Sequence, residues 1–234
     1  MSFEFLSTAG SALARSPMER QARAAGAVIA ARDGWNVAVR FDGDEAERER
    51  CRTVVGFADM CHLAKIEVQG DLAAILASGP PELGTARRSD GAWICPYHAR
   101  RALVICEPGA AVPLRERLEE AAGAAGELAS VIDLTSAVGG VVLAGPLARE
   151  TFARLTAIDL RPKLTPVHAF RPGSVARGPG AILREAEERY LMLFGAALGS
   201  YMWTVVADAA GSLGGGPVGV DVLDPIQAEV PAHA

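Results

Sequence analysis

One pattern occurs twice in this chain and constrains its fold more than any other feature. In each copy an aspartate follows a short apolar run, a strand pattern comes next, and a glycine ends that pattern before a helix. The aspartates are Asp59 and Asp133, and Gly70 and Gly145 follow them by 11 and 12 residues. Each copy continues into a further apolar strand and a helix. Because helices bury their apolar sides on one face of a sheet, the pattern predicts two similar strand-helix halves.

The predicted fold class is therefore α+β, with two duplicated halves and mixed or antiparallel sheets. The halves are expected at about 51–125 and 126–223, preceded by an N-terminal extension over 1–15. Residues 224–234 are predicted to be a tail, since they contain Pro225 and Pro231 and have little periodicity.

Periodicity and capping signals place the individual elements. Helices are predicted at about 17–25, 44–52, 71–77, 113–122, 145–155 and 199–213. Strands are predicted at 35–41, 65–69, 102–106, 141–144 and 190–194. Clusters of proline and glycine predict loops at 79–84, 162–172 and 178–180.

Composition excludes several classes of function. The formal charge of −5 is spread along the chain without a basic stripe, which argues against nucleic acid as a partner. Apolar runs such as 190–194 are far shorter than the roughly 20 residues of a spanning helix. The first ten residues lack the pattern of a secretory signal, so a cytoplasmic location is expected. The four cysteines match neither a disulfide scaffold nor a paired zinc motif and are interpreted as reduced thiols.

Several segments in order resemble the aminomethyltransferase family of the glycine cleavage T-protein. They are Ser16-Pro17-Met18, Gly34-Trp35, Val55-Gly56-Phe57-Ala58-Asp59-Met60-Cys61-His62-Leu63, Asp133-Leu134-Thr135-Ser136, Val142-Leu143-Ala144-Gly145-Pro146 and Gly214 to Gly219. The resemblance covers roughly 16–223 and implies a folate-binding fold without the family's C-terminal barrel domain. Within the family, the short chain and the Ser-Pro start resemble the gamma subunit of heterotetrameric sarcosine oxidase, a subunit that does not oxidise the amine.

Two departures from the family bear on activity. Catalytic members carry an aspartate in a loop after the first helix and a Gly-Tyr-Thr-Gly-Glu segment whose glutamate binds the pterin ring. Here the matching stretches read 91–98, with Cys95 and Pro96, and 177–183, with Gly178 and Pro179, and neither has a carboxylate. One-carbon transfer needs such a proton acceptor or anion. Glu185, Glu187 and Glu188 lie close by, so a shifted alignment would restore an acid.

Individual residues have a functional and a structural interpretation. Asp59, His62 and Leu63 are candidates for cofactor contact, whereas a turn held by Asp59 and Asp133 is the structural alternative. Cys95 and His98 have a zinc-like spacing but no second pair, so no metal is predicted. No Gly-x-Gly-x-x-Gly follows a strand, and therefore no dinucleotide is expected on this chain.

The leading hypothesis is a non-catalytic accessory subunit of a flavin-dependent, folate-linked N-methyl amine oxidase or dehydrogenase. The resemblance implies that flavin and tetrahydrofolate are held by partner flavoprotein subunits. Trp93, Ile94 and Tyr97 are predicted to contact such a partner, because aromatic residues supply large contact areas. The alternatives are a stand-alone tetrahydrofolate-dependent aminomethyltransferase or demethylase, and a folate-binding module without turnover.

Overall fold

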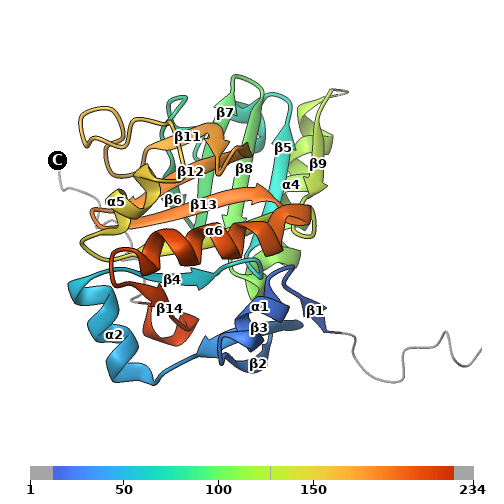
Figure 1. Ribbon diagram of the computed structural model, residues 1–234. Helices are drawn as coiled ribbons and strands as arrows, with labels where there is room; N and C mark the ends of the chain where they lie inside the picture. Colours follow the sequence, from blue (N-terminus) through green and yellow to red (C-terminus); the bar gives the residue numbers. More distant parts are fainter. Residues whose placement is uncertain (1–12, 127, 224–234) are drawn as a thin grey trace, which may run out of the picture.

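Two sheets stack face to face in this chain, and helices cover the outer side of each (Figure 1). The computed structural model describes residues 13–126 and 128–223. The first half comprises β4 (Gly56–Asp59), β5 (Ala64–Gln69), α3 (Leu72–Ile75), β6 (Arg87–Ser89), β7 (Ala92–His98), β8 (Arg101–Cys106) and α4 (Pro108–Ala125). The second half comprises β9 (Ser130–Asp133), β10 (Val138–Ala144), α5 (Ala148–Ala153), β11 (Phe170–Val175), β12 (Gly178–Ala186), β13 (Arg189–Gly195), the 3-10 helix η2 (Ala196–Leu198) and α6 (Gly199–Gly211).

Further elements flank the two halves. They are β1 (Ala14–Arg15), α1 (Glu19–Ala24), β2 (Val28–Arg32), β3 (Trp35–Arg40), α2 (Asp44–Thr53), β14 (Gly216–Pro217) and the 3-10 helix η3 (Val220–Val222). Strands β1, β3 and β2 form a small sheet, so Ala14 and Arg15 of the predicted extension pair with the body of the protein. The predicted tail, 224–234, lies outside the described residues.

The strand order confirms the predicted duplication. The five-stranded sheet runs β6-β7-β8-β5-β9, and the six-stranded sheet runs β11-β12-β13-β10-β4-β14. Each half therefore contributes four neighbouring strands in the same order, β6-β7-β8-β5 in the first half and β11-β12-β13-β10 in the second. The first strand of each half, β4 or β9, joins the sheet of the other half. At the crossing, the Met60 N–H donates to the Gly140 carbonyl at 2.9 Å, and the Leu134 N–H donates to the Lys65 carbonyl at 2.8 Å. The halves are thus joined by backbone hydrogen bonds as well as by packing.

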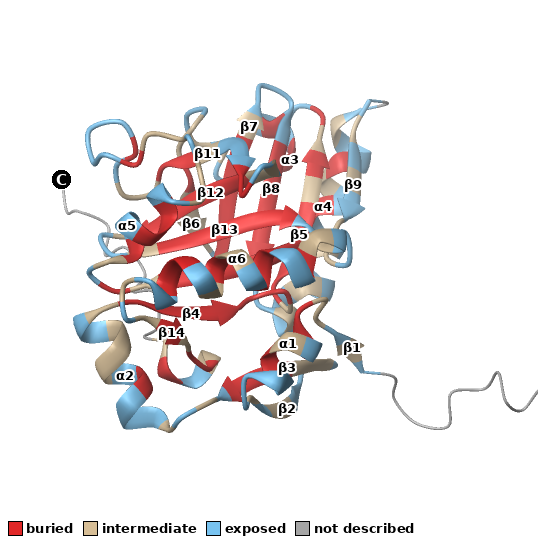
Figure 2. Ribbon diagram, viewed as in Figure 1, coloured by how far each residue is buried: buried red, intermediate tan, exposed pale blue. Residues whose placement is uncertain are grey.

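Three apolar clusters hold the layers together. One lies between the sheets and includes Leu103 and Ile105 from β8 and Leu191 and Leu193 from β13. A second packs α6, through Trp203 and other residues, on the outer side of the six-stranded sheet. The third packs α3 and α4 on the outer side of the five-stranded sheet. Figure 2 shows the burial that results along the central strands and the inner side of α6.

A short strap over 218–223 crosses back to the small sheet and to α2. The Glu47 carboxylate is buried and accepts the N–H groups of Phe41, Gly43 and Gly219 at 2.7, 3.0 and 2.6 Å. A side chain at position 219 would place its Cβ 1.9 Å from the Val39 carbonyl oxygen, so this approach requires glycine. These contacts fix the strap, which forms a wall of the cavities described below.

Three predicted boundaries are wrong. The loop predicted at 178–180 is the start of β12, where Gly180 pairs with Phe194 of β13. A Cβ at Gly180 would lie 2.3 Å from the Leu193 carbonyl oxygen, so this glycine permits a close strand approach instead of a turn. The end of the loop predicted at 162–172 is likewise part of β11, and α4 begins at Pro108, five residues before the predicted start. None of the described helices combines the length and the apolar character needed to cross a membrane.

Candidate functional site

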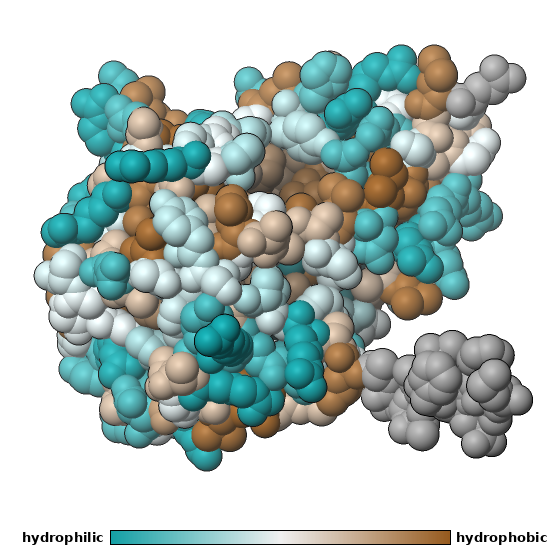
Figure 3. All heavy atoms as spheres, turned by 45° about the vertical axis from the view of Figure 1, so that its right-hand side comes forward, coloured by the Kyte–Doolittle hydropathy of each residue, from teal (hydrophilic) through white to brown (hydrophobic). Residues whose placement is uncertain are grey.

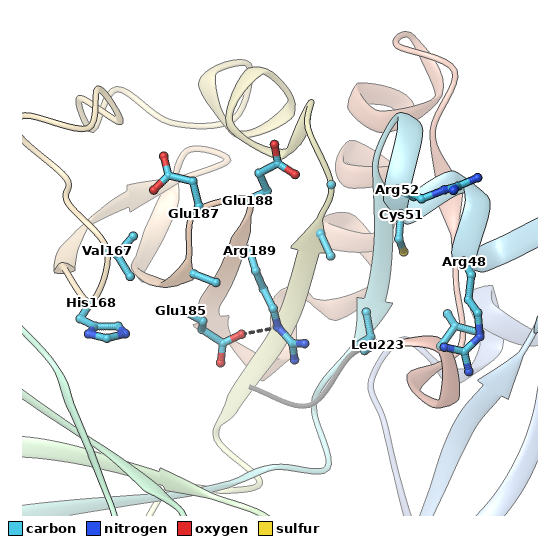
Figure 4. A pocket seen from close by; sticks show the side chains of 14 residues that line it. Arg48, Cys51, Arg52, Val167, His168, Glu185, Glu187, Glu188, Arg189 and Leu223 are labelled. Atoms are coloured by element: carbon cyan, nitrogen blue, oxygen red, sulfur yellow. Dashed lines mark hydrogen bonds and ion pairs between the residues drawn. The ribbon is translucent and has the colours of Figure 1, made fainter. Parts of the chain in front are cut away.

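A cavity of about 710 Å³ opens between the hairpin of β12 and β13 and helix α2 (Figure 4). It is lined by Arg48, Cys51, Arg52, Ala144, Gly145, Val167, His168, Glu185, Ala186, Glu187, Glu188, Arg189, Val222 and Leu223. A second cavity of about 370 Å³ shares Arg189 and Leu223 with it and reaches His62, Arg88 and Glu107. The two cavities therefore meet at Arg189 and at Leu223, which belongs to the strap.

A buried ion pair lies in the wall of the larger cavity. Arg189 Nε is 2.8 Å from Glu185 Oε2, and the two side chains are 15% and 3% exposed. Burial raises the pKa of Glu185, while Arg189 and the nearby Arg88 and Trp93 act in the opposite direction. In Figure 4, Glu185 and Arg189 face the cavity whereas Glu187 and Glu188 point away from them. Among Glu185, Glu187 and Glu188, Glu185 is thus the acid that faces the cavity as part of a buried ion pair.

Trp93 lies behind this ion pair, inside the protein. Its ring centroid is 5.2 Å from that of His168, and the Arg88 guanidinium carbon is 5.9 Å from the Trp93 ring centroid. Trp93 and Ile94 are 4% and 7% exposed, so their prediction as partner contacts is corrected. Trp93 packs between the two sheets and Ile94 packs against the layer of α3 and α4, so both faces of strand β7 are covered. Tyr97 is half-buried, contacts Glu67 through its hydroxyl, and stays a candidate for partner contact.

Cys95 lies in the stretch 91–98, where the resemblance implies a loop with an aspartate. It lies in β7 and is fully buried, and burial together with the charge of Glu185 raises its pKa well above the ordinary value of a thiol. The thiol is therefore neutral at physiological pH and is a poor proton acceptor. Cys95 belongs to the first departing stretch and Glu185 follows the second, and the two interact electrostatically.

The predicted candidates Asp59, His62 and Leu63 separate in the structure. Asp59 is buried at a turn where its Oδ1 accepts the Cys61 N–H at 2.9 Å, and Leu63 packs between the sheets. Neither lines a cavity described here. His62 does line the smaller cavity, and burial lowers its pKa to about 4, so its ring is neutral near pH 7.

A buried lysine lies beside this turn and was not singled out from the sequence. Lys65 Nζ donates to the carbonyls of Cys61 and Met60 at 2.8 and 3.3 Å. Burial lowers its pKa to about 8. Its hydrogen bonds go to the turn backbone, so its observed role is to hold the turn.

Sequence reasoning also missed Arg88, His168 and Arg189, which surround the cavities. The sequence does carry a signal for Glu185 and Arg189. Two apolar strand patterns, 181–186 and 189–194, follow each other, and these two opposite charges lie where the first pattern ends and the second begins. Charges are rarely buried in such strands unless they are paired. Within 13–126 and 128–223, no group of three or more histidine, cysteine, aspartate or glutamate side chains is placed to hold a metal ion.

Comparison with known proteins identifies relatives of one kind. No family model matches the chain. An aminomethyltransferase of Streptomyces coelicolor is 27% identical over 93% of this chain, and one of Saccharopolyspora erythraea is 24% identical over 92%. The chain spans 63% of the length of each of these curated relatives.

Solved structures show the same fold. The glycine cleavage system aminomethyltransferase T from Bartonella henselae superposes with a TM-score of 0.73 at 19% identity, over 90% of this chain and 60% of that one. A chain of heterotetrameric sarcosine oxidase from Corynebacterium superposes with a TM-score of 0.66 at 19% identity, over 92% of this chain and 99% of that one. The predicted aminomethyltransferase-like fold is thereby confirmed, and it corresponds to part of the T-protein chain.

Proposed function

We propose that this chain is a non-catalytic accessory subunit of a heteromeric, flavin-dependent and folate-linked oxidase or dehydrogenase of N-methyl amines. The observation that carries the proposal is the structural match to a chain of heterotetrameric sarcosine oxidase, which takes in 92% of this chain and 99% of that one.

The chemistry of the cavity wall supports the proposal. One-carbon transfer to a folate nitrogen requires a carboxylate or an equivalent base near the reacting atoms. Cys95 is a buried neutral thiol, and Glu185 is already bound to Arg189. Neither Cys95 nor Glu185 therefore presents an unpaired carboxylate.

A hydrophobic surface supports a partner for the chain. Val112 on α4, Leu128 between α4 and β9, and Ile132 on β9 are 56%, 79% and 40% exposed. Strand β9 is also the edge of its sheet. Figure 3 turns the side of α4 and β9 forward and shows hydrophobic side chains at its surface. Exposed apolar residues at an open strand edge favour association with another chain. We propose that a flavoprotein subunit covers the edge strand β9.

The cofactors of the complex follow from the same reasoning. Flavin and tetrahydrofolate would be held by the partner subunits, and the complex would work in the cytoplasm. The chain's own contribution would be to shape or stabilise the assembly.

A second function is favoured by one specific observation. Glu185 places a carboxyl group in the wall of a 710 Å³ cavity, near the place where the family's pterin-binding glutamate is expected. A folate-binding module without turnover would use this group. A stand-alone aminomethyltransferase or demethylase would need a further base, and Cys95 does not supply one.

Titration of the isolated chain with tetrahydrofolate separates these functions. The accessory-subunit proposal predicts no binding and no folate-dependent one-carbon transfer. Binding that is weakened in Glu185→Gln, without turnover, would establish the second function instead. Robust turnover by the pure chain would contradict both. The positive test is reconstitution, in which amine oxidation by the flavoprotein subunits is compared with and without this chain.

A further inference from the structure

An open groove of about 480 Å³ lies on the outer side of the six-stranded sheet, between α6, the end of α5 and the turn from β11 to β12 (Figure 1). It shares no lining residue with the two cavities described above. Its buried and half-buried residues are all apolar and form a floor: Leu155, Ala176, Val205 and Ala209. Its exposed residues form a mostly polar rim: Arg154, Arg177, Tyr201, Asp208 and Ser212.

The turn that carries Arg177 has a strained backbone. Ala176 and Arg177 have φ values of 44° and 65°, in the left-handed region that glycine and asparagine adopt more readily than other residues. The turn is nevertheless tied to the end of α5, because the Ala176 N–H donates to the Leu155 carbonyl at 2.5 Å and Thr156 Oγ1 donates to the Ser174 carbonyl at 2.7 Å. Strained residues that are held in this way cluster at functional sites. Here the strained turn places Arg177 on the rim of the groove.

The two arginines of the rim lack an acidic partner. Across the part of the chain that the structure describes, neither Arg154 nor Arg177 forms an ion pair or a side-chain hydrogen bond, whereas Arg149 on α5 pairs with Glu150 at 3.3 Å. Asp208, on the α6 side, is the one acid among the lining residues. The groove therefore carries an excess of positive charge, which attracts carboxylate groups.

Helix α6 contributes an exposed aromatic ring to the groove. Tyr201 is 44% exposed, and Val205 and Asp208 follow it at spacings of four and three residues, so the three lie on one face of the helix. Tyrosine and arginine are among the residues that contribute most to binding at protein interfaces. An apolar floor bordered by these two residue types is typical of a docking surface.

We propose that this groove binds a segment of a partner protein in which carboxylates flank a large apolar side chain. The apolar side chain lies on the floor beside Tyr201, and the carboxylates pair with Arg154 and Arg177. The proposal specifies the partner by its chemistry and does not rest on the accessory-subunit proposal. The groove lies over the six-stranded sheet, whereas the β9 edge belongs to the five-stranded sheet, so the two surfaces are tested separately.

The test is fluorescence anisotropy of the full chain with a dye-labelled peptide, Glu-Glu-Leu-Phe-Glu-Glu, and with its counterpart in which every glutamate is glutamine. We expect the glutamate peptide to bind about tenfold more tightly at low salt, and this preference to shrink as salt screens the charges. Arg177→Asn should remove most of the preference and is expected to fold, because asparagine suits the left-handed turn. Arg177→Lys keeps the charge and should retain part of the preference. Tyr201→Ala should weaken the binding of both peptides.

Arg149 provides the matched control. It is exposed and lies outside the groove, so Arg149→Glu should keep the full preference for the glutamate peptide. No binding of the glutamate peptide, or a preference that Arg177→Asn leaves unchanged, would overturn the proposal. A chain without residues 1–12 is titrated in parallel and should bind as the full chain does. A much higher affinity after this deletion would show that the chain's own segment occupies the groove, and the partner proposal would then be wrong.

Discussion

Asp59 and Asp133 hold equivalent turns in the two halves of the chain. In each, Oδ1 accepts a hydrogen bond of 2.9 Å from the backbone N–H two residues later. The residue after each aspartate then donates its N–H across to the other half, from Met60 to Gly140 and from Leu134 to Lys65. The duplicated pattern in the sequence thus marks the two places where the halves exchange their first strands.

The two turns differ in burial, and this predicts unequal effects of the same substitution. Asp59 is 8% exposed, whereas the Asp133 side chain is 48% exposed. Asp59→Ala leaves the buried Cys61 N–H without its acceptor and should cost about 1–3 kcal/mol of unfolding free energy. Asp133→Ala should cost less than about 1 kcal/mol, because water replaces the lost acceptor. Urea denaturation of both variants checks this, and equal losses would show that the burial argument is wrong.

His62 predicts a dependence of stability on pH. Its pKa in the folded protein, about 4, lies below the ordinary value of 6.5. Between these values the unfolded chain binds the proton and the folded chain does not, so the His62 contribution to stability falls as pH drops from 6.5 to 4.

The variant His62→Gln isolates this effect. The wild type should lose up to about 3 kcal/mol more stability than the variant over that pH range, and less where solvent screens the partly exposed ring. Carboxyl groups with raised pKa values, such as Asp59 and Glu185, act in the opposite sense but are present in both proteins. Parallel curves of unfolding free energy against pH would contradict the assignment of a neutral, half-buried His62.

Glu47 and Glu49 form a matched pair on helix α2. Glu47 is fully buried and accepts three backbone N–H groups, including that of Gly219 in the strap. The Glu49 side chain is 46% exposed and contacts Arg52 at the surface. Glu47→Ala should destabilise the protein by about 3 kcal/mol or more, since three donors lose their acceptor. Glu49→Ala should change stability by less than about 1 kcal/mol. Thermal unfolding measures both, and a tolerant Glu47→Ala would show that the strap does not depend on this carboxylate.

Much of the fold could be predicted because local patterns and long-range pairing agree. The turn aspartates, the strands around them and α6 follow from alternation and from glycine positions. The strand exchange between the halves could not be predicted, since either half pairs equally well with itself on local criteria alone. The loop predicted around Gly180 is wrong for a related reason. A glycine that permits a close approach of two strands cannot be distinguished in sequence from one that permits a turn.

The N-terminal helix shows how one side chain can have competing partners. The sequence Ser16-Pro17-Met18-Glu19 predicts a capping box, and Ser16 does accept the Met18 N–H at 3.0 Å. Glu19, however, binds Arg23 and Asn36 instead of the backbone at Ser16. Because Asn36 is distant in sequence, a local motif cannot predict that it binds Glu19.

The candidate site was the least predictable part. Trp93 was expected at a surface because aromatic residues are common at interfaces, and the structure places it inside. The stacking of the second sheet on this face of β7 decides this, and local sequence patterns do not carry that information. Glu185 was one of three neighbouring acids, and only the register of β12 with β13 selects it.

The most direct test of the accessory-subunit account is co-expression of this chain with the flavoprotein subunits of a sarcosine-oxidase-type enzyme from the same organism, followed by size-exclusion chromatography. The account predicts a stable complex, with an interface on the order of 2,000 Å² or more, and faster amine oxidation than the flavoprotein shows alone. Ile132→Asp on the edge strand β9 should abolish co-elution, whereas Leu164→Asp, at a residue exposed to a similar degree but outside that strand, should leave it intact. A chain that elutes as a monomer beside those partners at micromolar concentration would contradict the account.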